Sequence, residues 1–193
     1  DLIKRYREMA LHPECDGAIE DVVNEAIVSD LYDSPIEIEL SNLNASDKLK
    51  TAIREEFRTI KELLDFDKKS HEIFRNWYVD GRLYYHKVID LKRPQEGIKE
   101  LRYIDPMKMR FVRQEKKKGK NTIGPNISNG KEEKNTIAPE IEEYFVYTPK
   151  PAYPTNSYSS SGASKGVKIS KDSITYCTSG LVDRNKNTVL SYL

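Results

Sequence analysis

The pattern of hydrophobic and polar positions is clearest in residues 70–113, where its period changes once. Apolar residues first recur every three or four positions, which is typical of one helical face. These residues are Ile73, Phe74, Trp77 and Tyr78. Gly81 follows as the expected end of the helix. From 83 to 90 the period is two, residues 92–97 supply a proline and a glycine for a turn, and a second apolar run begins at Ile98. The segment predicts a helix, a strand, a reversal and a second strand.

The residues before this segment predict three further helices and one strand. Helical spacing begins at Leu2 and resumes after Pro13 with a second apolar stripe. Residues 36–40, with the sequence IEIEL, alternate strictly, as a half-buried strand does. Ser46 has the character of an N-cap for a long helix, whose stripe we expect to pack on the sheet or on the preceding helix. That stripe consists of Leu49, Ile53, Phe57, Ile60 and Leu64.

The residues after the hairpin predict more strands, separated by two polar segments. Residues 140–148, 167–170 and 173–178 favour strands. Residues 114–140 contain only four apolar side chains among 27 residues, and residues 149–166 contain three prolines and five serines but no acidic residue. Both are predicted to be exposed loops.

We therefore expect a single α+β domain with helices packed on a small, mostly antiparallel sheet. Residues 1–113 would form its helical and hairpin core. Residues 114–140 would be a flexible insert loop. Residues 141–193 would supply the remaining strands, with a Pro/Ser-rich loop at 149–166.

Composition and charge narrow the class of protein further. The chain of 193 residues has 37% hydrophobic and 33% charged residues, which is typical of a globular protein. Its net charge of +1, from 32 basic and 31 acidic residues, is too small to attract nucleic acid to the chain as a whole. Its apolar runs are far shorter than the roughly 20 residues that cross a bilayer, and no signal-peptide core is present, so we expect neither a membrane anchor nor secretion. Cys15 and Cys177 are expected to be two reduced thiols in a cytoplasmic protein.

Four phrases along the chain resemble a known family. They are FRNWYVDGRLYYHKVID at 74–90, KRPQEGIKELRYIDP at 92–106, EYFVY at 143–147 and SGLVD at 179–183. Their order and spacing are similar to those of the portal vertex proteins, or head-tail connectors, of T4-like tailed bacteriophages. The resemblance covers nearly the whole chain except the two polar segments, and it depends on tens of residues in register rather than on one short motif.

The resemblance implies a structural virion protein and no enzyme. The full-length protein would form a ring, a dodecamer in this family, at one capsid vertex. It would initiate head assembly, serve as the conduit for DNA packaging and ejection, and contact the major capsid protein, the scaffold, the terminase large subunit and the neck and tail proteins. Assembly would take place in the host cytoplasm. Helical spacing from the first residues and the apolar run TVLSYL at the end suggest an excised fragment. The resemblance implies that this fragment belongs to the wing region, which comes early in portal proteins.

The sequence offers little support for a metal or nucleotide site. His12, His71 and His86 are scattered, and none has another histidine or a cysteine at ligand spacing. Neither GxxxxGK[ST] nor GxGxxG occurs, which disfavours an ATPase motor. The energy for DNA movement would then come from a partner.

Two catalytic hypotheses are also weak. A hydrolase could use Ser179 beside Gly180, His86 and Asp183, but the GxSxG elbow is absent. The carboxylate pairs at 55–56 and 142–143 are more often solvated than paired in a two-metal nuclease. We predict no catalytic, cofactor-binding or metal-binding residues and no cofactor.

A non-enzymatic DNA-binding module is the alternative function. Long cations could contact phosphates, and aromatic rings could stack on bases. The cations are Arg110, Arg113, Lys116, Lys117, Lys118 and Lys120, and the aromatic residues are Tyr84, Tyr85, Tyr103 and Phe111. Acidic residues at 115, 132 and 133 flank the basic run, and the aromatics alternate as in a packed sheet. A solvated loop above an aromatic core is therefore favoured. The resemblance to portal proteins, whose wing faces outward, implies that this loop would contact proteins rather than the DNA channel.

The aromatic residues predict one shared core. We expect Phe57, Phe74, Trp77 and Tyr78 to anchor the helices against the strands that contain Tyr84, Val88 and Ile104. Replacing Trp77 by alanine would then cost roughly 3 to 5 kcal/mol if the indole is buried.

Overall fold

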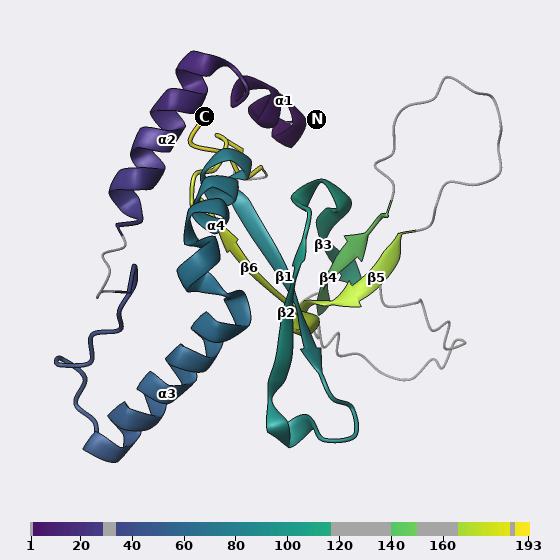
Figure 1. The fold of residues 1–193 in the computed structure, drawn as a ribbon. Coiled ribbons are helices and arrows are strands. Elements are labelled where there is room, and N and C mark those ends of the chain that lie inside the picture. The colour runs from purple at the N-terminus through teal and green to yellow at the C-terminus, as the bar shows by residue number, and fades with distance from the viewer. Residues whose placement is uncertain (1, 29–33, 117–139, 150–165, 186–187) are drawn as a thin grey trace, which may run out of the picture.

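The computed structural model describes residues 2–28, 34–116, 140–149, 166–185 and 188–193. Within them the chain forms four α-helices and two small antiparallel sheets, so the predicted α+β class is confirmed (Figure 1). The helices are α1 (Leu2–Met9), α2 (Pro13–Ala26), α3 (Asp47–Leu64) and α4 (Phe66–Asp80). The strands are β1 (Arg82–Ile89), β2 (Ile98–Ile104), β3 (Met109–Lys116), β4 (Glu140–Tyr147), β5 (Val167–Ser170) and β6 (Ile174–Thr178).

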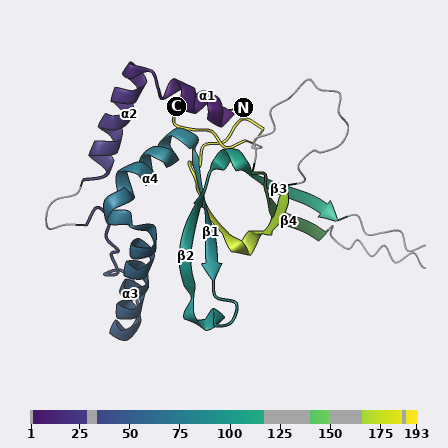
Figure 2. The same ribbon diagram turned by 45° about the vertical axis from the view of Figure 1, so that its right-hand side comes forward.

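The strands form two sheets where one was expected. The first sheet has the order β2-β1-β6 and the second has the order β3-β4-β5. Two short 3-10 turns carry the chain from one sheet to the other: η2 (Pro106–Lys108) joins β2 to β3, and η3 (Lys171–Ser173) joins β5 to β6. Figure 2 shows the two sheets facing each other.

The side chains between the sheets form a core of their own. Phe145 lies at its centre with no exposed surface, and it packs with Tyr84, Met109 and Ile174. Tyr84 on β1 and Phe145 on β4 meet edge to face, with 5.7 Å between their ring centroids. This core joins the two sheets without any residue of the helices.

The helices form a second core, so the prediction of one shared core is wrong. Val79 of α4 packs with Ile19 and Val23 of α2, and Phe74 and Tyr78 lie against this cluster. The reason is the alternation of β1, because Leu83 lines a pocket with Phe74 and Trp77 whereas the next residue points into the other sheet. In this arrangement α4 covers the outer face of the first sheet.

Trp77 lies at the edge of this helical core. Its side chain is half-buried and packs on Phe74 and Tyr192, with ring centroids 5.5 Å and 5.2 Å away. The cost of 3 to 5 kcal/mol for Trp77→Ala was conditional on a buried indole, and that condition is met only in part, because the indole Nε1 is buried while the side chain as a whole is half-buried.

The strand expected at residues 36–40 is absent, although the burial of its side chains alternates. Leu40 is buried, Ile36 and Ile38 are half-buried, and Glu37 and Glu39 are exposed, as the alternation predicted. The segment pairs with no strand among the described residues and lies along the first half of α3. Alternation indicates which side chains face inward, but it does not supply a hydrogen-bonded neighbour.

The start of α3 is as predicted, but its apolar stripe is not covered. The hydroxyl of Ser46 accepts a hydrogen bond from the amide of Leu49 at 3.4 Å, which confirms the N-cap. No residue of the helix is buried, and Leu49 and Ile60 are 52% and 46% exposed. The helix ends at Asp65 in a left-handed conformation, and it projects beyond the lower end of α4 in Figure 1. The expectation that the whole stripe packs on the sheet or a helix is therefore wrong.

Most of the two predicted loops lies outside the described residues. β3 continues to Lys116 and β4 begins at Glu140, and these two strands are antiparallel neighbours. Residues 117–139 and 150–165 are not described. The division into a core at 1–113, a loop at 114–140 and strands at 141–193 stays a prediction.

The turn from α4 into β1 is closed by the last residues of the chain. Gly81 has a φ of +70° and its amide donates to the carbonyl of Trp77 at 2.9 Å, so it ends α4 as predicted. The hydroxyl of Ser191 donates to the carbonyl of Tyr78 at 2.9 Å, and the guanidinium of Arg82 donates to the carbonyl of Val189 at 2.6 Å. Residues about one hundred positions apart thus fix the same turn.

Gly81→Ala is expected to lower the free energy of unfolding by more than about 2 kcal/mol. The left-handed conformation alone costs an L-residue about 1 to 2 kcal/mol. In addition, a Cβ atom would lie 2.5 Å from the carbonyl oxygen of Leu190, which is backbone and cannot rotate away. Urea unfolding measures the loss. Gly180→Ala is the matched control, because Gly180 also has a positive φ, of +78°, but has no atom within 4 Å of the added carbon. Equal losses in the two variants would show that the contact with Leu190 is unimportant.

Candidate functional site: a charged hollow between α1, α4 and β2

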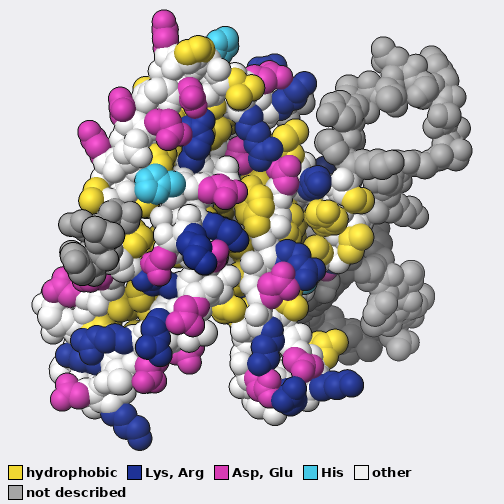
Figure 3. Space-filling view, viewed as in Figure 1, with side chains coloured by type: hydrophobic (Ala, Val, Ile, Leu, Met, Phe, Trp, Pro, Cys, Tyr) yellow, Lys and Arg dark blue, Asp and Glu magenta, His cyan; other side chains and the backbone are white. Residues whose placement is uncertain are grey.

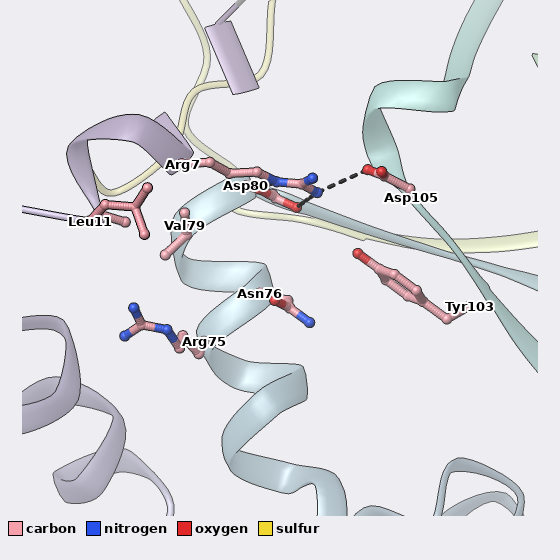
Figure 4. A pocket seen from close by; sticks show the side chains of 9 residues that line it. Arg7, Leu11, Arg75, Asn76, Val79, Asp80, Tyr103 and Asp105 are labelled. Atoms are coloured by element: carbon pink, nitrogen blue, oxygen red, sulfur yellow. Dashed lines mark hydrogen bonds and ion pairs between the residues drawn. The ribbon is translucent and has the colours of Figure 1, made fainter. Parts of the chain in front are cut away.

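Three charged residues from distant parts of the sequence meet beside the end of α4. The Arg7 guanidinium of α1 donates to both carboxylate oxygens of Asp80, at 2.9 Å and 2.7 Å. It also donates to Asp105, which follows β2, at 2.9 Å. Figure 4 shows Arg7 extending between the two carboxylates. One cation therefore joins the first helix, the end of α4 and the corner between the sheets.

Local structure places each of these groups. Asp80 is the last residue of α4, and the turn at Gly81 directs its side chain toward α1. Asp105 caps η2, since its carboxylate accepts a hydrogen bond from the amide of Met107 at 3.0 Å. The positions of the two carboxylates are thus set by a helix end and a turn.

The electrostatics of the cluster are those of a buried ion pair. Asp80 is 2% exposed, so its charge depends on the two hydrogen bonds from Arg7. The hydrogen bond with Asp80 raises the pKa of Arg7, and burial opposes that rise. Burial and the Asp80 charge raise the pKa of Tyr103, which stands at the opening of the hollow. Because Arg7 stays protonated and Tyr103 keeps its proton, neither can act as a base near neutral pH.

The hollow itself has a volume of about 410 Å³ and is open to solvent. Its floor is formed by Asn76 and Val79 of α4, and Arg75 stands at its side (Figure 4). Arg75 is already paired with Asp16 at 2.5 Å and with Glu20 at 2.7 Å, both on α2. The charges of the hollow therefore hold α1, α2, α4 and β2 together, and they form no pair of nucleophile and base.

Sequence reasoning missed this cluster. Arg7 is 73 positions from Asp80 and 98 from Asp105, and no local pattern connects them. The one available signal was that Asp80 and Asp105 lie within the two longest phrases that resemble the phage family.

The three histidines are placed separately. His12 precedes α2 and His71 lies on α4, both exposed, whereas His86 is half-buried on β1. Among the residues that the structure describes, no three His, Cys, Asp or Glu side chains gather where they could hold a metal ion. Cys15 and Cys177 are both free. The prediction that the chain has no metal, cofactor or catalytic residue stays a prediction.

The hydrolase combination is not brought together. The hydroxyl of Ser179 donates to the carbonyl of Leu190, and the carboxylate of Asp183 accepts from the amide of Arg184. His86 lies opposite Ile174, which is five residues, or about 17 Å of strand, away from Ser179. Ser179 and Asp183 therefore make hydrogen bonds to the backbone, and they form no catalytic site with His86.

The two carboxylate pairs are either exposed to solvent or held in ion pairs. Glu55 and Glu56 are exposed on α3. Glu142 pairs with Lys168, and Glu143 pairs with Lys171 at 2.5 Å and with Arg113 at 3.5 Å. The hydrogen bond from Lys171 lowers the pKa of Glu143. These are ion pairs across a sheet and give no two-metal arrangement in the described part of the chain.

The proposed DNA contacts are divided between the core and the surface. Tyr84 is buried, and Phe111 packs on Phe145 with 5.2 Å between ring centroids. Tyr85 and Tyr103 contact each other edge to face at 5.8 Å. Arg110 and Arg113 are exposed, and Arg113 is paired with Glu143. The lysines at 117, 118 and 120 lie outside the described residues, and nothing is described of the Lys116 side chain.

The described residues thus form an α+β unit whose charged groups hold its own elements together, as in a structural protein. Comparison with known protein families agrees with a structural role. Residues 1–193 match the family described as Bacteriophage T4-like portal protein (Gp20), and the chain belongs to this family.

Two relatives are themselves named as portal proteins. The portal protein of Vibrio phage KVP40 is 35% identical over 183 residues, which cover 94% of this chain and 33% of the relative. The portal protein of Salmonella phage ViI is 33% identical over 112 residues, covering 58% of this chain and 20% of the relative. The chain therefore spans about a third of the length of the first relative. The sequence-based recognition of a portal protein, or head-tail connector, is confirmed, and a phage portal protein is a component of the virion.

No helix in the described ranges is both long enough and apolar enough to cross a lipid bilayer.

Proposed function

We propose that the protein carrying this chain forms a dodecameric ring at one vertex of a phage head, and that residues 1–193 belong to the wing region of each subunit. The match of all 193 residues to the T4-like portal family carries this proposal. The ring would be the conduit through which DNA enters during packaging and leaves on ejection.

The partners follow from that position. Neighbouring portal subunits would close the ring, and the major capsid protein and scaffold would surround it when head assembly begins in the host cytoplasm. The terminase large subunit would dock during packaging, and neck and tail proteins would bind later. The chain has no glycine-rich phosphate loop, so the terminase would supply the energy for DNA movement. The portal would act without catalysis and without a cofactor.

The described surface supports a role in protein contacts. Large apolar side chains are exposed on several elements, including Leu11 between α1 and α2, Leu49 and Ile60 on α3, and Leu91 after β1. Figure 3 shows hydrophobic atoms interrupting the charged surface at the centre of the view and at its right. Single exposed apolar side chains are normal on a protein surface, but apolar atoms that gather, as in these two areas of Figure 3, mark protein interfaces.

The mass of the full-length protein in solution tests the proposal. Light scattering across a concentration series, with electron microscopy of the same sample, is expected to show closed rings of uniform size. The isolated 193-residue chain, measured beside it, shows whether this region assembles by itself. A full-length protein that stays monomeric at all concentrations, alone and with its scaffold, would contradict the ring.

The alternative, a DNA-binding module, predicts a different result in the same preparation. Binding of the isolated chain to duplex DNA would weaken steeply with salt, because each phosphate contact releases a counterion. The described residues provide no specific observation in favour of this alternative, since Tyr84 is buried in the core between the sheets and the ring of Phe111, although 40% exposed, packs on Phe145. We expect no retention of DNA by the isolated chain at physiological salt.

A further inference from the structure

The small net charge of the chain conceals two oppositely charged segments. Helix α2 carries five carboxylates and no lysine or arginine. Residues 82–113, which run from β1 into β3, carry nine lysines and arginines against four acidic residues. Opposite charges on separate surfaces of one molecule attract a second copy and fix its orientation.

Three carboxylates of α2 point away from the rest of the molecule. Glu14, Asp21 and Glu25 are exposed, and their spacing of seven and four residues places them on one side of the helix, here called the acidic face of α2. Ile19 and Val23, on the opposite side, pack on α4. The two other carboxylates are bound to an arginine of α4, whereas the acidic face pairs with no described residue. Figure 3 shows acidic side chains projecting from the upper left edge, over α2.

A pocket with basic groups lies between the two sheets. It has a volume of about 340 Å³ and is open to solvent. His86 of β1, Arg102 of β2 and Lys108 of η2 supply its basic groups, and it is here called the basic pocket. Its wall also contains apolar residues from the edge of the core between the sheets, namely Ile104, Tyr147 and Ile169.

The charges of the basic pocket are not all compensated within the described residues. Lys108 is half-buried, and its side chain forms no ion pair with a described carboxylate. His86 makes no hydrogen bond with a described residue. Glu100 binds Arg102 through Nε at 3.0 Å and Nη2 at 2.8 Å, and Asp105 is bound in the charged hollow. These two acids disfavour a polyanion such as DNA, and the Lys108 ammonium suits one carboxylate side chain.

The acidic face of α2 and the basic pocket lie on opposite sides of the subunit. α2 packs on α4, and α4 covers the face of the first sheet that carries Leu83. His86 lies on the other face of β1, with Tyr84, toward the second sheet. Figures 1 and 2 both show α2 and the second sheet separated by α4 and the first sheet. Complementary surfaces on opposite sides of a molecule produce the head-to-tail contact that closes a ring.

We propose that the acidic face of α2 in one subunit docks at the basic pocket of a neighbouring copy of this chain. One carboxylate of the acidic face enters the pocket and pairs with the Lys108 ammonium, and His86 and Arg102 lie beside it as further donors. The inference rests on the proposed ring in requiring a second subunit beside the first.

Zero-length coupling in the full-length protein tests this contact. A water-soluble carbodiimide joins an amine to a carboxylate only where the two are in contact. Treatment of the purified protein should give covalent multimers on a denaturing gel. Peptide mass mapping of these multimers should place a bond between Lys108 and Glu14, Asp21 or Glu25.

A lysine on the same strand region provides the first matched control. Lys108→Met keeps much of the side chain and removes the amine, so it should abolish the bond to α2. Lys87→Met should leave that bond unchanged, because Lys87 is also without a described partner but lies on the face of β1 opposite His86.

Neutral acidic variants provide the second control. Glu14→Gln, Asp21→Asn and Glu25→Gln, combined in one protein, should abolish the bond to Lys108. Glu55→Gln with Glu56→Gln should leave it unchanged, because these two exposed glutamates lie on α3.

Three outcomes would overturn the docking. The first is coupling of Lys108 to no carboxylate, or only to carboxylates outside the acidic face of α2. The second is a bond between Lys108 and α2 found within one chain. The third is loss of the bond when duplex DNA is added at physiological salt, which would assign the basic pocket to phosphate.

Electron microscopy of the same samples separates the docking from the proposed ring. Intact rings in which Lys108 is not coupled to α2 contradict the docking and leave the proposed function in place. Coupled subunits that form no ring support the docking and contradict the proposed function. A protein with neither rings nor coupling contradicts both.

Discussion

Phe145→Ala is expected to lower the free energy of unfolding by about 3 to 5 kcal/mol, because it empties the centre of the core between the two sheets. Phe145 is completely buried, and its ring contacts those of Tyr84, Phe111 and Tyr176 at centroid distances of 5.7, 5.2 and 5.6 Å. These residues come from three strands besides β4, so the lost contacts cannot be recovered by one local shift. Urea unfolding followed by circular dichroism measures the change.

Tyr144→Ala provides the comparison for Phe145→Ala. Tyr144 is the neighbouring residue on β4, half-buried on the other face, where its ring lies 4.0 Å from the Lys168 ammonium. We expect a loss of about 1 kcal/mol or less, because such exposed cation–π contacts are weak. A loss for Phe145→Ala as small as that for Tyr144→Ala would show that the two sheets do not share this core.

Arg7→Met is expected to destabilise the protein by about 3 kcal/mol, because it leaves the Asp80 carboxylate buried without its cation. Methionine keeps much of the length of the side chain and removes the charge and the hydrogen bonds. Breaking a buried ion pair by removing one partner usually costs about 3 to 5 kcal/mol. We expect the lower end of this range, since Arg7 is 37% exposed and water can reach the vacated position. Thermal and urea unfolding both measure this loss.

A double-mutant cycle with Asp80→Asn separates the pair from its surroundings. The double variant should lose less stability than the sum of the two single variants, since asparagine brings no buried charge. Lys4→Met is the control on the same helix, because Lys4 pairs with the exposed Glu8 at 3.6 Å and with no other residue that the structure describes, and its loss should stay below about 0.5 kcal/mol. Additive losses in the cycle would mean that Arg7 and Asp80 do not stabilise each other.

The sequence predicted those elements whose signals are local. The end of α4 at Gly81, the β1–β2 hairpin and the N-cap at Ser46 each depend on a few adjacent residues, and each is found in the structure. At these positions the hydrophobic period and the turn-forming residues are sufficient to predict the local structure.

The features that the sequence did not predict depend on distant residues. The pattern at 36–40 correctly indicated which side chains are buried, but the pairing that would make the segment a strand is a property of the whole sheet. The stripe of α3 has the periodicity of a packed helix, and its partial exposure follows from the direction that the turn at Asp65 gives to the helix. The Arg7 cluster joins three sequence positions that no single window contains.

The closure of the Gly81 turn by residues 189–191 has a consequence for the order of folding. The helices and the β1–β2 hairpin can form from neighbouring residues, but the junction between α4 and β1 is complete only when a segment more than one hundred positions later has docked. Contacts of such high sequence separation carry a large loop-closure entropy and form late. The junction that fixes α4 on its sheet is therefore expected to be the last part to become rigid during folding, and the first to open under mild denaturant, ahead of the core around Phe145.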